Sequence, residues 1–307
     1  MSGFAERLKT RIPSWPQFLR RAASDRRRIA YDLLPVLTLN QREAVSRNLA
    51  RFRPKTRDFR PSARAQALHA ELAADGITRM QEPLAAPVLD ALVGYFKTVL
   101  CNDPYRPHLG RFKWDEVPSD EVNIGYFTWE EVIQAPHMLE LVNNPDILAV
   151  AELYLGCKPT LDNIGCYWSF GGRNTAKGVQ RFHRDFDCTK SVKAFFYLTD
   201  ITAANGPHVY VRGSHRSHML GVGKAQTDAT IEEAFGGESI TPVTGPAGAW
   251  FLEDVYGFHK GALPQEGARL LLAIEYNLFR SPLAPSRPVL ARDPRYDRYV
   301  NRVFVEA

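Results

Sequence analysis

The pattern of hydrophobic and polar positions divides the chain into a helical first part and a strand-rich second part. Residues 61–155 read as mostly helical, most clearly at 87–100, where apolar residues recur at helical spacing. The predicted helices are 63–74, 87–100, 129–134 and 137–154, with a helix start at Asn144-Pro145. From about Lys158 short apolar runs alternate with turn residues. The predicted strands are Thr160–Phe170, Arg181–Asp185, Ala194–Tyr197, His208–Val211, Ala249–Leu252 and Arg269–Tyr276.

Short strands separated by Gly, Asn and Pro turns favour an antiparallel double sheet of the jelly-roll kind. We therefore predict an α+β fold with a mostly β core and flanking helices from the N-terminal half. The predicted organisation is a basic helical arm at 1–60, one domain at 61–290 and a Pro/Arg-rich tail at 281–307. Within the domain, 61–155 is the helical part and 156–280 the jelly-roll core. A short first strand is expected at 76–80.

Charge is distributed unevenly along the chain. Residues 1–60 contain 15 Lys and Arg against 5 Asp and Glu, whereas the remainder contains 24 against 29. The arm is broken by Pro13, Pro16, Pro35 and Pro54. It is expected to be a basic helix that caps the domain, or a surface that contacts an anionic partner such as acidic lipid. Nucleic-acid binding is not expected, because no aromatic platform or reading motif accompanies the charge.

Composition points to an intracellular globular protein. No run approaches the ~20 apolar residues that span a bilayer, and the N-terminus shows no apolar segment of a secretory signal. The four cysteines show neither metal-binding spacing nor a disulfide framework. We expect a cytoplasmic location, with peripheral contact at the inner membrane face through residues 1–60 left open.

Three residues in the strand-rich half form a candidate iron site. His183 and Asp185 are two positions apart, so on an extended strand both side chains leave the same face. With the distant His259 they make the 2-His-1-carboxylate set that binds Fe(II) and leaves coordination positions open. Asp187 would share that face and competes with Asp185. Arg269, ten residues after His259, is expected to present its guanidinium group to a carboxylate.

Several motifs resemble the phytanoyl-CoA dioxygenase (PhyH-like) family of Fe(II)/2-oxoglutarate-dependent oxygenases. The resemblance covers roughly residues 70–280 and rests on the following stretches: Asp75-Gly76-Ile77-Thr78, Phe196 to Pro207 with its Asn-Gly-Pro end, Gly213-Ser214-His215-Arg216, and Gly248-Ala249-Trp250-Phe251 leading to His259. It implies a double-stranded β-helix in which His183, Asp185 and His259 bind the catalytic iron. It further implies that Arg269 pairs with 2-oxoglutarate, which O2 converts to succinate and CO2 while an unactivated C–H bond is hydroxylated.

The chain departs from this family at some positions. Relatives often have Ser or Thr where this chain has Gly261, so Arg269 is expected to act with a tyrosine or water instead. Gln180, three residues before His183, either reaches the cosubstrate's C1 end or lies at the pocket rim. Asp185 stands where halogenating relatives have Gly or Ala, which favours hydroxylation and leaves desaturation or ring formation open.

Other functions and the substrate stay open. One alternative is a non-catalytic jelly-roll module that binds through its basic arm. Another is a cupin-type metalloenzyme that works without 2-oxoglutarate and uses Arg269 structurally. We expect a small-molecule substrate, and the arm favours an anionic or membrane-borne one. The predicted substrate-facing lid is the polar segment 102–125, through Tyr105, Arg106, His108, Arg111 and Trp114.

Overall fold

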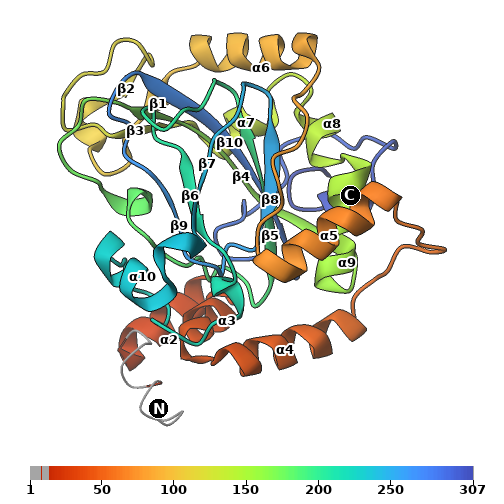
Figure 1. The fold of residues 1–307 in the computed structure, drawn as a ribbon. Coiled ribbons are helices and arrows are strands. Elements are labelled where there is room, and N and C mark those ends of the chain that lie inside the picture. Colours follow the sequence, from red (N-terminus) through yellow and green to blue (C-terminus); the bar gives the residue numbers. More distant parts are fainter. Residues whose placement is uncertain (1–7, 9–13, 307) are drawn as a thin grey trace.

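The chain folds as a helical layer around two antiparallel sheets (Figure 1). The computed structural model describes residue 8 and residues 14–306. The helices are α2 (Trp15–Ser24), α3 (Arg27–Leu33), α4 (Leu39–Arg51), α5 (Ala63–Asp75), α6 (Ala86–Thr98), α7 (Trp129–Ile133), α8 (Met138–Val142), α9 (Pro145–Leu155), α10 (Asp228–Phe235) and α11 (Arg298–Asn301). Within the described part of the chain, no helix has both the length and the hydropathy to cross a bilayer.

The larger sheet has seven strands in the order β2-β1-β3-β4-β10-β5-β8, and the smaller has the order β7-β6-β9. The strands are β1 (Cys101–Asn102), β2 (Arg111–Phe112), β3 (Ile124–Tyr126), β4 (Thr160–Phe170), β5 (Ser191–Tyr197), β6 (His208–Val211), β7 (Ile240–Val243), β8 (Trp250–Glu253), β9 (His259–Gly261) and β10 (Ala268–Asn277). Every strand pair in both sheets is antiparallel. The prediction of an α+β fold with a mostly β, jelly-roll core is confirmed.

Helices from the N-terminal half pack beside the larger sheet, and capping residues define where they begin and end. At the start of α9, the Asn144 side chain accepts hydrogen bonds from the first backbone N–H groups, and Gly156 ends the helix in the left-handed region. Helices α5 and α9 pack against each other, as Figure 1 shows to the right of the sheet. Buried residues of both helices, such as Leu72 of α5 and Ile147 of α9, join the main hydrophobic core with β4, β5, β8 and β10. This core fixes the strands that carry the candidate site.

The arm packs along one end of the molecule, at the bottom of Figure 1. Thr38 begins α4 with a capping box to Gln41, and Ala50 packs with Leu155 and Leu278 in a small apolar cluster. Of the predicted arm, residues 1–7 and 9–13 lie outside the described residues, as does residue 307 of the tail. The domain boundaries stay a prediction.

Three local expectations differ from the structure. Arg181–Asp185 is not a strand: its backbone is tied through isolated bridges at Phe182 and His183. The segment 76–80 likewise makes a single bridge at Ile77 and no strand. The segment 102–125 contains the edge strand β2 and the start of β3, and so it partly belongs to the sheet rather than to a free loop.

Candidate metal centre

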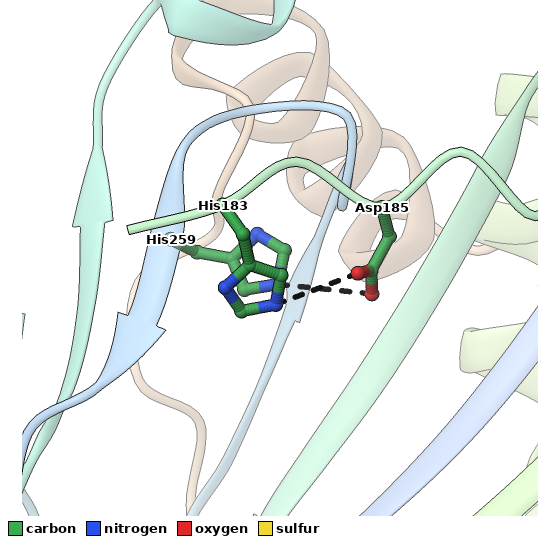
Figure 2. A group of neighbouring side chains, drawn as sticks. All are labelled: His183, Asp185 and His259. Atoms are coloured by element: carbon green, nitrogen blue, oxygen red, sulfur yellow. Dashed lines mark ion pairs between the residues drawn. The ribbon is translucent and has the colours of Figure 1, made fainter. Parts of the chain in front are cut away.

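His183, Asp185 and His259 lie together in the structure (Figure 2). Each offers one ligand atom, and these atoms all lie within 4.8 Å of one another. Asp185 Oδ1 is 3.4 Å from His183 Nε2, and Asp185 Oδ2 is 3.7 Å from His259 Nε2. Two imidazole nitrogens and one carboxylate at this spacing fit a single ion of the first-row transition metals.

Backbone pairing between two distant segments brings the histidines together. The N–H of His183 donates to the carbonyl of His259 at 3.0 Å, and the reverse bond is also 3.0 Å. This reciprocal pair holds the two rings 4.3 Å apart between centroids. Asp185 N–H donates to the carbonyl of Val255 at 2.8 Å, which continues the pairing. The backbone of 183–185 is therefore extended, and both side chains reach the same place although no full strand forms.

The tautomer of each histidine is set by a backbone carbonyl. His183 Nδ1 lies 2.9 Å from the carbonyl oxygen of Arg181, and His259 Nδ1 lies 3.0 Å from that of Gly257. A carbonyl only accepts, so each Nδ1 donates and each Nε2 keeps its lone pair for a metal. Burial lowers the pKa of His259 to about 4, with the charge of His183 adding to the effect. His259 is thus neutral at pH 7, as a metal ligand must be.

A buried lysine keeps Asp185 ionised. Lys193 Nζ, from the middle of β5, lies 2.9 Å from Asp185 Oδ2 and 3.3 Å from Glu275 Oε2 on β10. Burial opposes ionisation of Asp185, but the charges of Lys193 and the two histidines outweigh it and hold the pKa of Asp185 below its usual value. Asp185 is therefore a carboxylate at neutral pH.

Asp187, the competing carboxyl, behaves differently. Burial first, and then the charges of Glu275 and Asp185, raise the pKa of Asp187 to about 8. It holds its proton at pH 7, and within the described residues the three-ligand group does not include it. The geometry thus favours Asp185.

A second pair supports the site from behind. His208 Nε2 lies 2.6 Å from Glu253 Oε2, and the His208 ring stacks on His259 with centroids 5.6 Å apart. Burial raises the pKa of Glu253 to about 7. Sequence reasoning missed Lys193, His208 and Glu253 as parts of this site. The available signal was a charged residue inside or ending a strongly apolar strand, at Lys193 in β5 and at Glu253 in β8.

Arg269 lies behind the wall of the same cavity. It is 1% exposed, it opposes Ser169 in the β4–β10 register, and its Nη2 donates to Ser169 Oγ at 3.1 Å. Its Nη1 donates to the carbonyl of Gly206, and its Nε has no partner among the described residues. A Cβ on Gly261 would lie only 2.6 Å from Nη2. The glycine at this position therefore makes room for the guanidinium group.

A cavity of about 530 Å³ opens beside the three ligands. Gly261, Lys193 and Glu275 line it with the three ligands. Its apolar and aromatic walls comprise Tyr126, Phe127, Trp129, Ile164, Tyr167, Val179, Phe195 and Ala273. A volume of this order suits a small-molecule ligand, since such sites typically measure roughly 300–1,000 Å³.

Gln180 and the predicted lid lie elsewhere. Gln180 is buried, and its Oε1 accepts from Asn123 Nδ2 at 2.7 Å and from the N–H of Lys177 at 3.0 Å. Neither it nor the five predicted lid residues are among the described residues that line this cavity. In the lid segment, Arg106 pairs with Asp103 and Glu121. Residues 126–130, just after that segment, form the wall instead.

Comparisons with known proteins place the fold but not the family. No family model matches the chain, and no curated protein does. SnoN of nogalamycin biosynthesis, a non-heme alpha-ketoglutarate-dependent epimerase, is similar with a TM-score of 0.51 at 19% identity, covering 80% of this chain and 97% of SnoN. HygX from Streptomyces hygroscopicus, solved with nickel, 2-oxoglutarate and hygromycin B, has a TM-score of 0.50 at 16% identity, covering 78% and 96%. At such identities the likeness shows a shared fold, and the PhyH-like resemblance stays a prediction.

Proposed function

We propose that this protein is an Fe(II)/2-oxoglutarate-dependent oxygenase that hydroxylates a C–H bond of a small or mid-sized metabolite. The observation that carries the proposal is the convergence of His183, Asp185 and His259, with the Nδ1 of each histidine held by a backbone carbonyl. SnoN and HygX, which share the fold, are described with the same cosubstrate. The PhyH-like motifs add support from the sequence.

The residues present fit both groups. His183, Asp185 and His259 would hold the iron on one side and leave its other side facing the cavity. When bound, Fe(II) with 2-oxoglutarate and O2 supplies the oxidant for an unactivated C–H bond, with succinate and CO2 as coproducts. Arg269, with an unpartnered Nε and a fork next to Gly261, would hold a carboxylate of 2-oxoglutarate.

The other residues around the site orient the metal ligands and exclude water. Lys193 fixes one oxygen of Asp185, so the other oxygen is left for the metal. His208 and Glu253 support His259 through ring stacking and burial. The aromatic walls of the cavity keep the reacting carbon away from bulk water. Tyr126 and Tyr167, whose rings lie 5.4 Å apart on this wall, are candidates for the second partner of the 2-oxoglutarate carboxylate.

An anaerobic titration tests the proposal. Metal-free protein is loaded with Fe(II) and then with 2-oxoglutarate, and the visible charge-transfer band near ~500 nm is followed, which is expected when a keto acid chelates iron in an open facial site. We expect the band in wild type, its loss in His259→Ala, and a need for much more 2-oxoglutarate in Arg269→Ala. Iron binding without the band would favour the 2-oxoglutarate-independent metalloenzyme. A protein that binds neither Fe(II) nor 2-oxoglutarate would favour the non-catalytic module.

A further inference from the structure

A second cavity, of about 540 Å³, lies between the arm and the β core. Helix α4 and the residues just after it form one wall. The other walls come from the end of α9, the segment 189–191 that leads into β5, the turn at 215–216, and the segment 254–256. Asp185 lines this cavity as well as the cavity beside the metal ligands. The arm thus closes a space that reaches the candidate metal centre from its other side.

The lining of this second cavity is strongly basic. Its basic side chains are Arg42, Arg47, Arg51, Lys55, Lys190 and Arg216. The acidic ones are Glu43, Asp185 and Asp254. Among the described residues, only Arg47 of the basic set has a carboxylate within ion-pair distance, namely Glu43 at 3.7 Å. The six basic side chains outnumber the three acidic ones, so the lining of the cavity carries a net positive charge.

The other two carboxylates are already engaged. Asp254 accepts a hydrogen bond from the hydroxyl of Tyr154 and another from the N–H of Tyr256 at 2.9 Å. Asp185 belongs to the candidate metal centre and pairs with Lys193. The negative charge of Asp254 partly offsets the charges of Arg42 and Lys190, but three acidic side chains do not balance six basic ones. An anionic ligand would supply the missing countercharge.

Arg42 shows most clearly that a partner is missing. It is 3% exposed, its Nη2 donates to the carbonyl of Cys188 at 2.6 Å, and its guanidinium group stacks on Tyr256 at 4.1 Å. Its Nη1 has no hydrogen-bond partner among the described residues. Burial lowers the pKa of Arg42, because a charged group out of water is unfavourable without a countercharge. An acceptor at Nη1 would remove this penalty.

Two hydroxyl groups in the same cavity are also unpartnered. Ser46 lies one turn after Arg42 on α4 and is 3% exposed, and Thr189, next to Cys188, is 7% exposed. Neither hydroxyl has a hydrogen-bond partner among the described residues. Buried polar groups are nearly always paired in folded proteins, so three such donors around one cavity indicate a ligand with several acceptor oxygens. A guanidinium fork with hydroxyls beside it is the arrangement that suits an oxoanion.

We propose that this cavity binds an oxoanion, a phosphate or a closely related group, carried by the substrate of the adjoining metal centre. The proposal rests on the proposed function for the identity of that substrate, but the anion site itself stands on the cavity alone. Helix α4 would then select anionic substrates, while the metal ligands on the other side of Asp185 perform the chemistry. The oxoanion belongs either to a small metabolite or to a lipid headgroup.

Calorimetric titration of the full chain with inorganic pyrophosphate tests the site. The protein is first freed of metal with a chelator, so that a bound ion cannot take the anion. We expect saturable binding in wild type, weakened about ten- to a hundred-fold in Arg42→Gln, since a charge-assisted hydrogen bond is lost. The double variant Arg51→Gln/Lys55→Gln changes two exposed positions and is expected to weaken binding without disturbing the fold. His259→Ala should bind pyrophosphate as wild type does, which separates this test from that of the iron chemistry.

Arg57→Gln is the matched control. It removes the same charge from a side chain that is 97% exposed and does not line the cavity. Binding that is absent in wild type up to ~10 mM pyrophosphate would overturn the proposal, because a site with several charge-assisted bonds is expected to be tighter. So would an equal loss in Arg57→Gln and in both cavity variants. Sedimentation with phosphatidylcholine vesicles, with and without phosphatidic acid, distinguishes the two sources. Vesicle binding that Arg42→Gln abolishes assigns the oxoanion to a lipid headgroup. Pyrophosphate binding without vesicle binding assigns it to a small metabolite.

Discussion

Replacing Gly261 with serine is expected to weaken 2-oxoglutarate binding, although a hydroxyl there would add a hydrogen-bond donor. A Cβ at this position would lie 2.6 Å from Arg269 Nη2 and 3.4 Å from Nη1. Ordinary contacts between heavy atoms lie at roughly 3.5 Å, so the guanidinium group must retreat by about 1 Å. It is fully buried and tied to Ser169 and to the carbonyl of Gly206. The retreat therefore breaks hydrogen bonds rather than using free space.

The size of the effect follows from these contacts. Overpacking of this kind typically destabilises a protein by about 1–3 kcal/mol. Loss of the bidentate pairing with a carboxylate removes charge-assisted bonds worth about 1.5–3 kcal/mol, which corresponds to about ten- to a hundred-fold weaker 2-oxoglutarate binding. The anaerobic titration that follows the band near ~500 nm measures this affinity directly. Iron affinity should change little, because none of the three ligands is replaced.

Gly165→Ala is the matched control for this substitution. Gly165 lines the same cavity from β4, and a Cβ there meets nothing within 4 Å. We expect this variant to keep the wild-type affinity for 2-oxoglutarate and the wild-type free energy of unfolding. If Gly261→Ser binds 2-oxoglutarate as tightly as wild type does, Arg269 is not the partner of its carboxylate in the geometry described, and the reasoning fails.

Three further predictions concern the metal and the buried charges. Fe(II) should raise the thermal midpoint of wild type but not of His183→Ala, measured anaerobically by scanning fluorimetry, because only the folded site gathers the ligands; an equal rise in both would contradict this. Lys193→Met should lower the free energy of unfolding of the metal-free protein by ~3 kcal/mol in urea, since Glu275 loses its cation, and adding Glu275→Gln should restore part of it. Burial, with Glu275 adding to it, raises the pKa of Asp162 to about 6, above its unfolded value, so its carboxyl favours the folded state below about pH 4 and loses that contribution as pH rises to about 6. The difference in free energy of unfolding between Asp162→Asn and wild type should therefore shift by ~2 kcal/mol in favour of the variant from pH 4 to pH 8. A difference that stays the same across this range would refute the prediction.

The sequence was sufficient for features that depend on local pattern. The bounds predicted for Thr160–Phe170 match β4, and 269–276 lies within β10, because long apolar runs between turns specify strands well. The strands missed were the short β1, β2 and β3 of the first half and, in the second half, β7 and β9. Strand β7 contains Pro242, and β9 has only three residues, starting at His259. Neither therefore has the apolar alternation that identifies a strand.

The site could be predicted only as far as residue type and order define it. The three metal-ligand candidates follow from a known combination of ligand types. Lys193 and Glu275 become neighbours through the β5–β10 register, which pairs residues far apart in the chain. No local pattern specifies that register, and none shows that Gly261 must lack a side chain because Arg269 fills the space. Cross-strand neighbours of this kind are visible only in the folded structure.

The basic arm illustrates the same limit in its charge. Its net charge left two roles open, a helix that caps the domain and contact with an anionic surface, and the structure divides its arginines into two sets. Those of α4, among which Arg42 is buried, line the cavity between the arm and the β core. In α2 the exposed Trp15 and Leu19, at 59% and 62%, lie beside exposed Arg20. The surface of an anionic membrane would attract this outer set, whereas an oxoanion bound in the cavity needs Arg42. Salt should therefore weaken any vesicle contact far more than it weakens pyrophosphate binding, because screening acts mainly on exposed charges.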